Sequence, residues 1–281
     1  MNAHVKPFVL RAITGFHLTF CRRELPDNLA IYFHELEEWQ RPALADMLSW
    51  LADSGYRSVD AGEFVTAGRA GEKRVFLSFD DNFRGWHAAL DLFDRHGATC
   101  TFYVNTAPIR DVADASAIRA FFDRIRYSGD DTTLSRREIR EIHDAGHTIG
   151  CHTHSHPVLA QLPRERWDEE IRAPRDYLAA LIDAPVEDFS FPFGMRRHFG
   201  AELRDYCAGL GFRTIASGIS GLQHVAPPDP LNLHRTGWRL DLPLEDNLAR
   251  VSIHAPIYGG LMGRSAVGCS NWAALPLPFI W

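Results

Sequence analysis

The chain alternates short apolar runs with amphipathic segments, the pattern of strands followed by helices. Strands are predicted at residues 29–33, 56–59, 74–79, 99–104, 147–151, 189–191 and 213–216. Helices are predicted at residues 42–53, 86–96, 117–125, 135–145, 165–182 and 201–210. Because strands and helices alternate throughout, we expect an α/β fold, a parallel sheet with helical crossovers.

Two of these helices carry local signals beyond their periodicity. The helix at 135–145 should begin with Ser135 as its N-cap, and Glu138 three residues later should complete a capping box. The helix at 165–182 contains Pro174, which should kink or interrupt it because proline lacks the backbone N–H that a helix interior needs. These signals predict the start of one helix and a break in the other.

The composition is that of an ordinary globular protein. The 281 residues are 46% hydrophobic and 23% charged, and they contain no internal repeat or low-complexity linker. We therefore expect one domain spanning residues 1–281, with residues 254–281 unassigned because their periodicity is weak. The net charge of −6 and the absence of a dense basic stretch argue against a nucleic-acid partner.

Cysteine usage and hydropathy bear on the compartment. The five cysteines are scattered and form no CxxC pair, which favours reduced thiols over a disulfide framework. The N-terminal segment has no uninterrupted apolar run with a cleavage site, and no run approaches the ~18 apolar residues of a membrane helix. We expect a cytoplasmic protein without a transmembrane segment; peripheral membrane association and the oligomeric state stay open.

Two adjacent acids, Asp80 and Asp81, follow the apolar strand at 74–79. Like charges at such a position raise each other's pKa unless a cation neutralises one of them. A metal on one carboxylate would leave the other free to act as a base. A solvated turn with an N-capping Asp would also explain the pair, so it needs support from elsewhere in the chain.

That support comes from a histidine cluster after the strand at 147–151. His152, His154 and His156 lie within five residues, and imidazole is the commonest side-chain metal ligand. A helical turn would place His152 beside His156, whereas an extended chain would place it with His154. One carboxylate and two imidazoles suit Zn²⁺, and also Co, Ni, Fe or Mn. Such a metal would polarise a carbonyl and lower the pKa of bound water, with Asp80 placed to accept the proton.

Three motifs in this order resemble those of the polysaccharide deacetylases, the NodB-homology family or carbohydrate esterase family four. They are Ser78-Phe79-Asp80-Asp81, His152-Thr153-x-x-His156 and Phe191-Pro192-Phe193-Gly194. The similarity covers about residues 28–240. It implies a distorted (β/α) barrel and metal-dependent removal of N- or O-acetyl groups from the sugars of a polysaccharide, an oligosaccharide or a glycan precursor.

The resemblance also implies roles for individual residues. The expected base is Asp80, and the expected metal ligands are Asp81, His152 and His156. His154 becomes a neighbour of the metal rather than a ligand. The third motif is expected to contact the saccharide through Pro192, Phe193 and Gly194.

A catalytic acid is still required to protonate the leaving group. In a permuted subset of the family this histidine comes early, and residues 31–36, with His34, resemble that segment. In many other members it comes late, and residues 251–254, with His254, resemble that motif. We favour His34, with His254 as the alternative; a core histidine would explain either one without catalysis.

The sequence departs from the family pattern at two positions. Asn82 follows the acids where glycine is usual, and we expect it to take the left-handed conformation that asparagine tolerates. Ser190 stands where many members have an arginine that pairs with the base. Arg235 could supply that guanidinium from another strand, or it could form an ordinary surface ion pair. The aromatic residues that could stack on a sugar ring, or simply fill the core, are Phe193, Trp238 and Trp86.

Two other functions fit parts of the pattern. A carbohydrate-binding member of the fold with impaired catalysis would keep the metal set but lack the arginine or the acid. Another metal-dependent amidohydrolase would use His152 and His154. Its barrel normally has the H-x-H on the first strand and a single late Asp, whereas here the acids come first.

Overall fold

The computed structural model describes residues 25–220, 228–248 and 251. Its strands are β1 (Asn28–Phe33), β2 (Tyr56–Val59), β3 (Lys73–Asp81), β4 (Thr101–Val104), β5 (Thr148–Cys151), β6 (Asp188–Ser190), β7 (Thr214–Ser217), β8 (Leu233–His234) and β9 (Thr236–Gly237). Its α-helices are α2 (Arg41–Asp53), α3 (Ala61–Phe64), α4 (Gly85–Ala88), α5 (Leu90–Arg95), α6 (Ala115–Ile125), α7 (Arg136–Asp144), α8 (Ala173–Ile182) and α9 (Ala201–Gly209). Two short turns matter below, the 3₁₀ turn η2 (Glu38–Gln40) and the π turn η5 (Asp168–Arg172).

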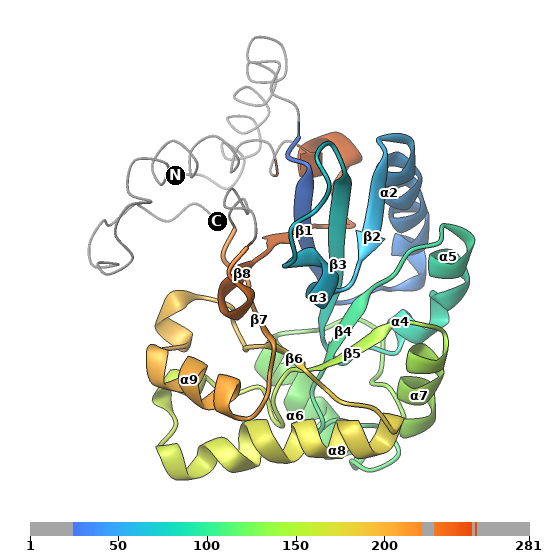
Figure 1. Cartoon of the computed structure of the whole chain (residues 1–281). Coiled ribbons are helices and arrows are strands. Elements are labelled where there is room, and N and C mark those ends of the chain that lie inside the picture. The colour runs from blue at the N-terminus through green and yellow to red at the C-terminus, as the bar shows by residue number, and fades with distance from the viewer. Residues whose placement is uncertain (1–24, 221–227, 249–250, 252–281) are drawn as a thin grey trace, which may run out of the picture.

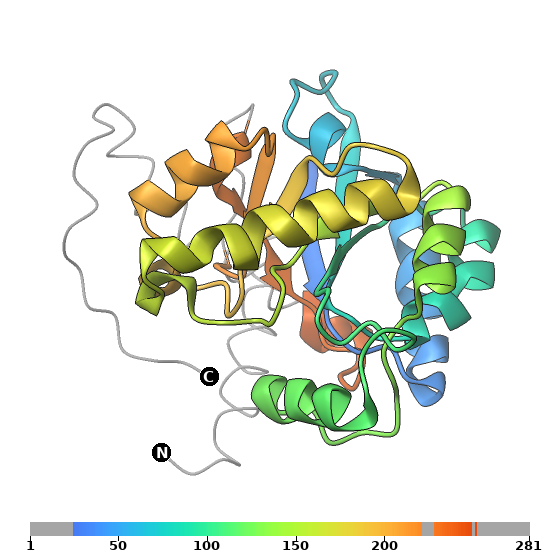
Figure 2. The ribbon, with the colours of Figure 1, turned by 90° about the horizontal axis from the view of Figure 1, so that it is seen from below.

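The described strands form one parallel sheet that curls into a nearly closed barrel (Figure 1). Neighbouring strands follow the order β8-β7-β6-β5-β4-β3-β1-β9. β3 is shared, because residues 73–76 pair with β2 and residues 78–81 pair with β4. The helices lie around the outside of the strands (Figure 2). The predicted α/β fold, a distorted (β/α) barrel, is confirmed.

One short segment, residues 233–237, closes the barrel. β8 at its start pairs with β7, β9 at its end pairs with β1, and Arg235 lies between the two. Neither strand is predictable from the sequence, since each has only two residues and leaves no periodic pattern. This closure brings a residue from late in the chain next to β1 and β3.

The predicted strands are all present, with ends that differ by at most two residues. Two helix predictions are wrong in their extent. Residues 86–96 form the separate helices α4 and α5, because Ala89 leaves helical geometry at φ −100° and ψ 7°. Residues 165–182 begin with 3₁₀ and π turns, and α8 starts only at Ala173. Pro174 lies in the first turn of α8, where a missing N–H needs no partner, so the predicted break is confirmed.

Local capping follows the sequence closely at α7. Ser135 is its N-cap, the Ser135 side chain accepts from the backbone N–H of Glu138, and the Glu138 side chain returns to the N–H of Ser135. The described cysteines, Cys100, Cys151 and Cys207, are buried free thiols. No helix in the described part of the chain is long and apolar enough to span a bilayer.

The alternation of side chains along β3 separates the core from the barrel interior. Leu77 and Phe79 belong to the main hydrophobic cluster that the sheet forms with the helices. Phe76 packs in a smaller cluster with residues of β4, β7 and β8, inside the barrel. Since successive side chains of a strand point to opposite faces, Ser78 and Asp80 share this inward face. Ser78 and Asp80 therefore lie next to the apolar cluster around Phe76 and mark the position of the candidate site.

Candidate metal centre and catalytic site

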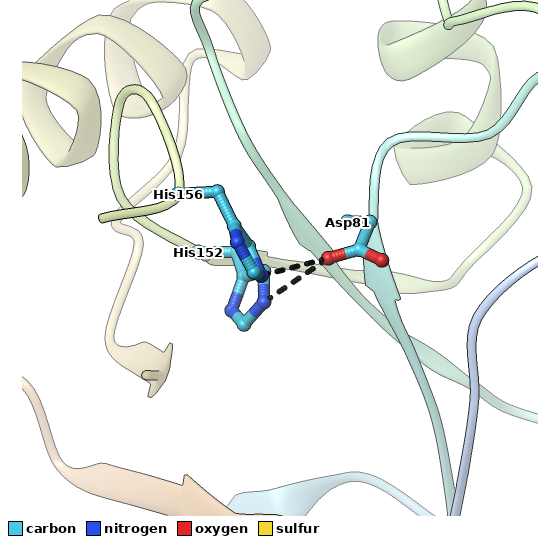
Figure 3. A group of neighbouring side chains, drawn as sticks. All are labelled: Asp81, His152 and His156. Carbon is cyan, nitrogen blue, oxygen red and sulfur yellow. Dashed lines mark ion pairs between the residues drawn. The ribbon is translucent and has the colours of Figure 1, made fainter. Parts of the chain in front are cut away.

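Three buried side chains from the carboxyl ends of β3 and β5 converge on one point (Figure 3). Nε2 of His152 lies 3.4 Å from Oδ1 of Asp81, and Nε2 of His156 lies 3.2 Å from the same oxygen. The three donor atoms all lie within 4.8 Å of one another. Around a tetrahedral ion with ligand bonds of about 2.0–2.2 Å, donor atoms lie about 3.4 Å apart, so this spacing suits a metal. The structure therefore brings together the three residues that the sequence predicted as ligands.

The hydrogen bonds around these donors also suit a cation. Nδ1 of His152 lies 2.6 Å from the backbone carbonyl oxygen of Ser190. Donation from Nδ1–H to that oxygen leaves the lone pair of Nε2 free, the arrangement usual for metal-binding histidines. Oδ1 of Asp81 and Nδ1 of His156 are buried, and neither has a hydrogen-bond partner among the described residues. A buried orphan of this kind costs about 1–3 kcal/mol, which a metal on Asp81 would offset.

The ionisation of these side chains also bears on metal binding. Burial would raise the pKa of Asp81, but the close contacts with His152 and His156 outweigh it and hold that pKa well below its usual value. Burial lowers the pKa of His156, whereas at His152 the charges of Asp80 and Asp81 outweigh burial and raise the pKa, so a metal there would displace a proton. An ionised carboxylate and a neutral imidazole are the forms that bind a metal.

The two histidines meet through an irregular loop, neither helical nor extended. Thr153 and His156 have positive φ values of 73° and 60°. The N–H of His156 donates to Oγ1 of Thr153 at 3.1 Å, which closes the turn. His154 lies outside the cluster, with its Nδ1 2.9 Å from Oγ1 of Thr106. The histidine pair of the amidohydrolase alternative, His152 with His154, is therefore not formed.

Glu170, on η5, holds this loop in place. Its Oε2 accepts from the N–H of Ser155 at 2.9 Å, and its Oε1 accepts from the Ser155 hydroxyl at 2.7 Å. Its backbone carbonyl accepts from the N–H of His154 at 3.0 Å. The side chain is only 2% exposed. Glu170 is not among the site residues that the sequence predicts, because an acid within the run 168–170 resembles the solvated start of a helix.

Asp80, on the inward face of β3, is bound by Arg235. Nη1 donates to Oδ1 at 2.8 Å and Nη2 donates to Oδ2 at 2.7 Å, a bidentate pair. The hydroxyl of Ser190 donates to Oδ2 at 3.1 Å. Arg235 is fully buried, so the alternative interpretation, an ordinary surface ion pair, is wrong. The guanidinium that the sequence placed near Asp80 reaches it from the segment between β8 and β9.

Arg235 is contacted on several sides. Its Nη1 donates to Oγ of Ser78 at 2.9 Å, and its Nε donates to the backbone carbonyl of Ser217 at 3.0 Å. Its Cζ lies 4.9 Å from the ring centroid of Tyr32 and 5.2 Å from that of Tyr103, within the range of cation–π attraction. The guanidinium therefore has little freedom to move away from Asp80.

This environment sets the protonation state of Asp80. Burial would raise its pKa, but the charges of Arg235 and His152 and the hydrogen bonds from Arg235 outweigh burial, and the pKa is lowered. Asp80 is consequently ionised at neutral pH and able to accept a proton.

His34 directly follows β1, at the same mouth of the barrel as the two acids. Its side chain is exposed, so the core-histidine interpretation is wrong for this residue. After burial and the closer partners, the charge of His34 is a further influence that lowers the pKa of both Asp80 and Asp81, so it lies near both carboxylates. His254, the alternative acid, lies outside the described residues.

The third motif presents an aromatic ring to the metal centre. Pro192 and Gly194 are buried, whereas Phe193 is 44% exposed. The Phe193 ring stands edge-on to the ring of His156, with centroids 4.7 Å apart. Both Phe193 and Gly194 have positive φ, and a Cβ at Gly194 would approach the backbone nitrogen of Gly218 to 2.4 Å. Glycine is therefore required at 194 for the turn that displays Phe193.

The two tryptophans considered for sugar stacking differ in position. Trp86 is fully buried, and its indole N–H donates to the backbone carbonyl of His34 at 2.7 Å, so it belongs to the core. Trp238 is 6% exposed and lines a cavity together with His34. Of the three aromatic candidates, Phe193 is the exposed one.

The turn after the paired acids differs from the expectation. Asp81 takes the left-handed conformation, with φ 86°, and Asn82 does not. This φ interrupts the alternation of β3 and turns the Asp81 carboxylate toward the histidines (Figure 3). Asn82 is instead a buried link, donating to the carbonyl of Asn105 and accepting from the N–H of Leu134, each at 2.8 Å. Asn105 in turn donates to the carbonyl of His152, which connects the two halves of the centre.

Comparison with known proteins agrees with this geometry. The family model described as polysaccharide deacetylase matches residues 67–215, just over half of the chain. This match is shorter than the expected 28–240 and includes neither His34 nor Arg235. None of the curated proteins matches the chain.

Solved structures share the fold at low sequence identity. The deacetylase PplD of Streptococcus pyogenes, solved with acetate, has 17% identity and a TM-score of 0.64, covering 81% of this chain and 99% of its own. IcaB from Ammonifex degensii has 18% identity and a TM-score of 0.63, covering 80% and 96%. BC0361, a polysaccharide deacetylase from Bacillus cereus, has 16% identity and a TM-score of 0.58, covering 80% and 68%.

Proposed function

Because the chain belongs to the polysaccharide deacetylase family, we propose that it hydrolyses acetyl groups from sugars at a single metal centre built on Asp81, His152 and His156. Family membership makes it a carbohydrate deacetylase. The finer assignment rests on one observation, the buried carboxylate–imidazole cluster with the ionised, arginine-bound Asp80 directly beside it. The proposed substrate is an N- or O-acetylated saccharide in a polysaccharide, an oligosaccharide or a glycan precursor.

The donor set indicates the class of metal. One carboxylate and two imidazole nitrogens favour zinc, and the same donors accept Co, Ni, Fe or Mn. Such an ion supplies Lewis acidity toward the acetyl carbonyl and toward water. Ser190, through its backbone carbonyl, keeps Nε2 of His152 available for it.

Asp80 is the proposed base. Its carboxylate lies one residue from the ligand Asp81 and is held by Arg235 and Ser190, so its orientation is set before substrate arrives. Its Oδ1 accepts only from Arg235 and retains acceptor capacity, since an ionised carboxylate oxygen can accept two hydrogen bonds, whereas Oδ2 already accepts from both Arg235 and Ser190. It can therefore take the proton of an attacking water at the acetyl carbon.

His34 is the proposed acid. It is exposed at the barrel mouth and near both carboxylates, whereas the base is buried. A proton on its imidazole can pass to the nitrogen or oxygen that remains on the sugar when the acetyl group leaves.

The test is acetate release by the full chain from a panel of N- and O-acetylated saccharides, with and without a chelator. Chelation should abolish release, and adding back Zn²⁺ or Co²⁺ should restore it. Release that is insensitive to chelation would contradict the metal assignment. A protein that binds metal and saccharide but releases no acetate from any member of the panel would instead be a carbohydrate-binding member of the fold.

A further inference from the structure

A cavity of about 370 Å³ opens beside His34, at the mouth of the barrel. Its walls come from the residues after β1 and after β9, two strands that pair in parallel, so both walls stand at the carboxyl end of the sheet. A cavity of this size at this end of an α/β barrel is where ligands bind. His34, the proposed acid, lines the cavity, so the cavity adjoins the proposed catalytic site.

Trp39 stands at the edge of this cavity as a fixed aromatic surface. Trp39 is 60% exposed, and exposure to water is unfavourable for a large aromatic ring. It is nevertheless oriented, because its indole N–H donates to Oε2 of Glu37 at 2.7 Å. Glu37 is itself anchored, since the hydroxyl of Tyr127 donates to Oε1 at 2.7 Å and the side chain of Gln40 accepts from its N–H at 2.7 Å. A ring held open to solvent in this way is prepared for stacking on a ligand.

The polar groups of the cavity suit hydroxyl groups rather than phosphates. Among the described residues that line it, Arg239 is the one arginine or lysine. Its Nε donates to Oδ1 of Asp241 at 2.9 Å, and Asp241 also lines the cavity, so this charge is already paired. Glu35 adds a carboxylate. A diphosphate would meet the carboxylate of Glu35 and a guanidinium already bound to Asp241, whereas sugar hydroxyls can bond to carboxylates and guanidinium alike.

The chemistry of deacetylation connects the cavity with the substrate. The leaving nitrogen or oxygen stays on the sugar, so the acid that protonates it must face the sugar rather than the acetyl group. If His34 is that acid, the rest of the saccharide extends from His34 into the cavity. This step rests on the proposed function.

We propose that the cavity is a subsite for a second, uncharged pyranose unit that stacks on Trp39, so the substrate is an oligosaccharide or polysaccharide chain and not a nucleotide-linked monosaccharide. Trp238 forms the buried wall of the subsite, and Glu35, Arg239 and Asp241 bond to its hydroxyl groups.

The experiment measures binding and needs no turnover. Isothermal titration calorimetry of the full chain in chelator, where hydrolysis is stopped, gives Kd for N-acetylglucosamine, for its β-1,4- and β-1,6-linked tetramers and for UDP-N-acetylglucosamine. We expect at least one tetramer to bind about tenfold more tightly than the monomer, and Trp39→Ala to remove most of that ratio, since an aromatic stacking contact contributes about 0.5–1.5 kcal/mol. Trp39→Phe should keep part of the ratio.

Tyr177→Ala is the matched control, because Tyr177 is another exposed aromatic residue, on α8, that does not line the cavity. It should leave every Kd unchanged. The proposal is overturned if neither tetramer binds more tightly than the monomer, if Trp39→Ala keeps the full ratio, or if UDP-N-acetylglucosamine binds more tightly than both tetramers. A Trp39-dependent ratio without any acetate release would refute the proposed function and leave the subsite standing. Acetate release without a Trp39-dependent ratio would support the proposed function and refute the subsite.

Discussion

Replacing Arg235 with alanine would leave the buried carboxylate of Asp80 without its cation. The substitution removes the two bonds to Asp80 at 2.8 and 2.7 Å, together with the bonds to Ser78 and Ser217. Asp80 is 5% exposed and would keep the Ser190 hydroxyl at 3.1 Å. Because burial raises the pKa of Asp80 and Arg235 is the main group that lowers it, the pKa should rise in the variant.

The expected effect on stability is large. Removing one partner of a buried ion pair destabilises a protein by about 3–5 kcal/mol. For a chain of this length that lowers Tm by about 10 °C. Turnover should also fall by about 10²–10⁴-fold at neutral pH, since a protonated Asp80 cannot act as a base.

The contribution of Asp80 to folding stability should change with pH in opposite directions in the native chain and in Arg235→Ala. In the native chain the lowered pKa of Asp80 contributes stability that is present above its unfolded pKa of about 3.9 and is lost as pH falls through the lower folded value. In Arg235→Ala the folded pKa exceeds the unfolded one. Ionised Asp80 then destabilises the variant at neutral pH, and the deficit relative to the native chain shrinks as pH falls toward 4.

The assay combines urea unfolding at pH 7 and pH 5, acetate release and metal content of the purified proteins. Arg235→Lys is the control: it keeps the charge but loses the planar fork, so both its stability and its turnover should be intermediate. An Arg235→Ala protein with an unfolding free energy within about 0.5 kcal/mol of the native value and unchanged turnover would refute the reasoning.

Four further substitutions test the rest of the site. Asp80→Asn should lower acetate release by about 10²–10⁴-fold with bound metal retained, because it removes the proton acceptor and no ligand; near-normal release would mean that the base lies elsewhere. His156→Ala should lose most of its metal by atomic absorption, since one of three clustered donors disappears, while His154→Ala should keep it; equal losses would contradict the ligand set. Glu170→Ala should weaken metal affinity by about 10–100-fold in a chelator competition, because it frees the loop before the second histidine, and Glu170→Gln, whose amide can still bond to both groups of the loop, should restore most of it. His34→Gln should lower kcat by about 10²-fold at unchanged metal content, and an unchanged kcat would assign the acid to another residue.

The elements and the identities of the ligands could be read from local pattern. Strand periodicity predicted β3 to within two residues of each end, and the capping box at Ser135 predicted the start of α7. Asp81, His152 and His156 stand out because metal-binding residue types follow apolar strands, and parallel strands bring their carboxyl ends to one edge. These features depend on residues close together in the chain.

Other features depend on contacts between residues far apart in the chain, which no local sequence pattern reveals. The left-handed residue is Asp81 and not Asn82. The side chain of Asn82 is instead hydrogen-bonded to the backbone of Asn105 and Leu134 in neighbouring segments. Glu170 lies 15 positions beyond Ser155, and only the π turn of η5 aims it at the histidine loop. No motif announces such a pairing.

The sequence by itself therefore determined the α/β alternation, the residues proposed as metal ligands and the family, since periodicity and residue chemistry express them locally. Only the tertiary structure decided how the proposed base, Asp80, is charged. Arg235 reaches Asp80 across 155 positions because residues 233–237 close the barrel between β7 and β1. The same closure sets Trp238 opposite His34 and so shapes the cavity beside Trp39. Long-range strand pairing, with its burial of charge, is a property of the folded barrel as a whole.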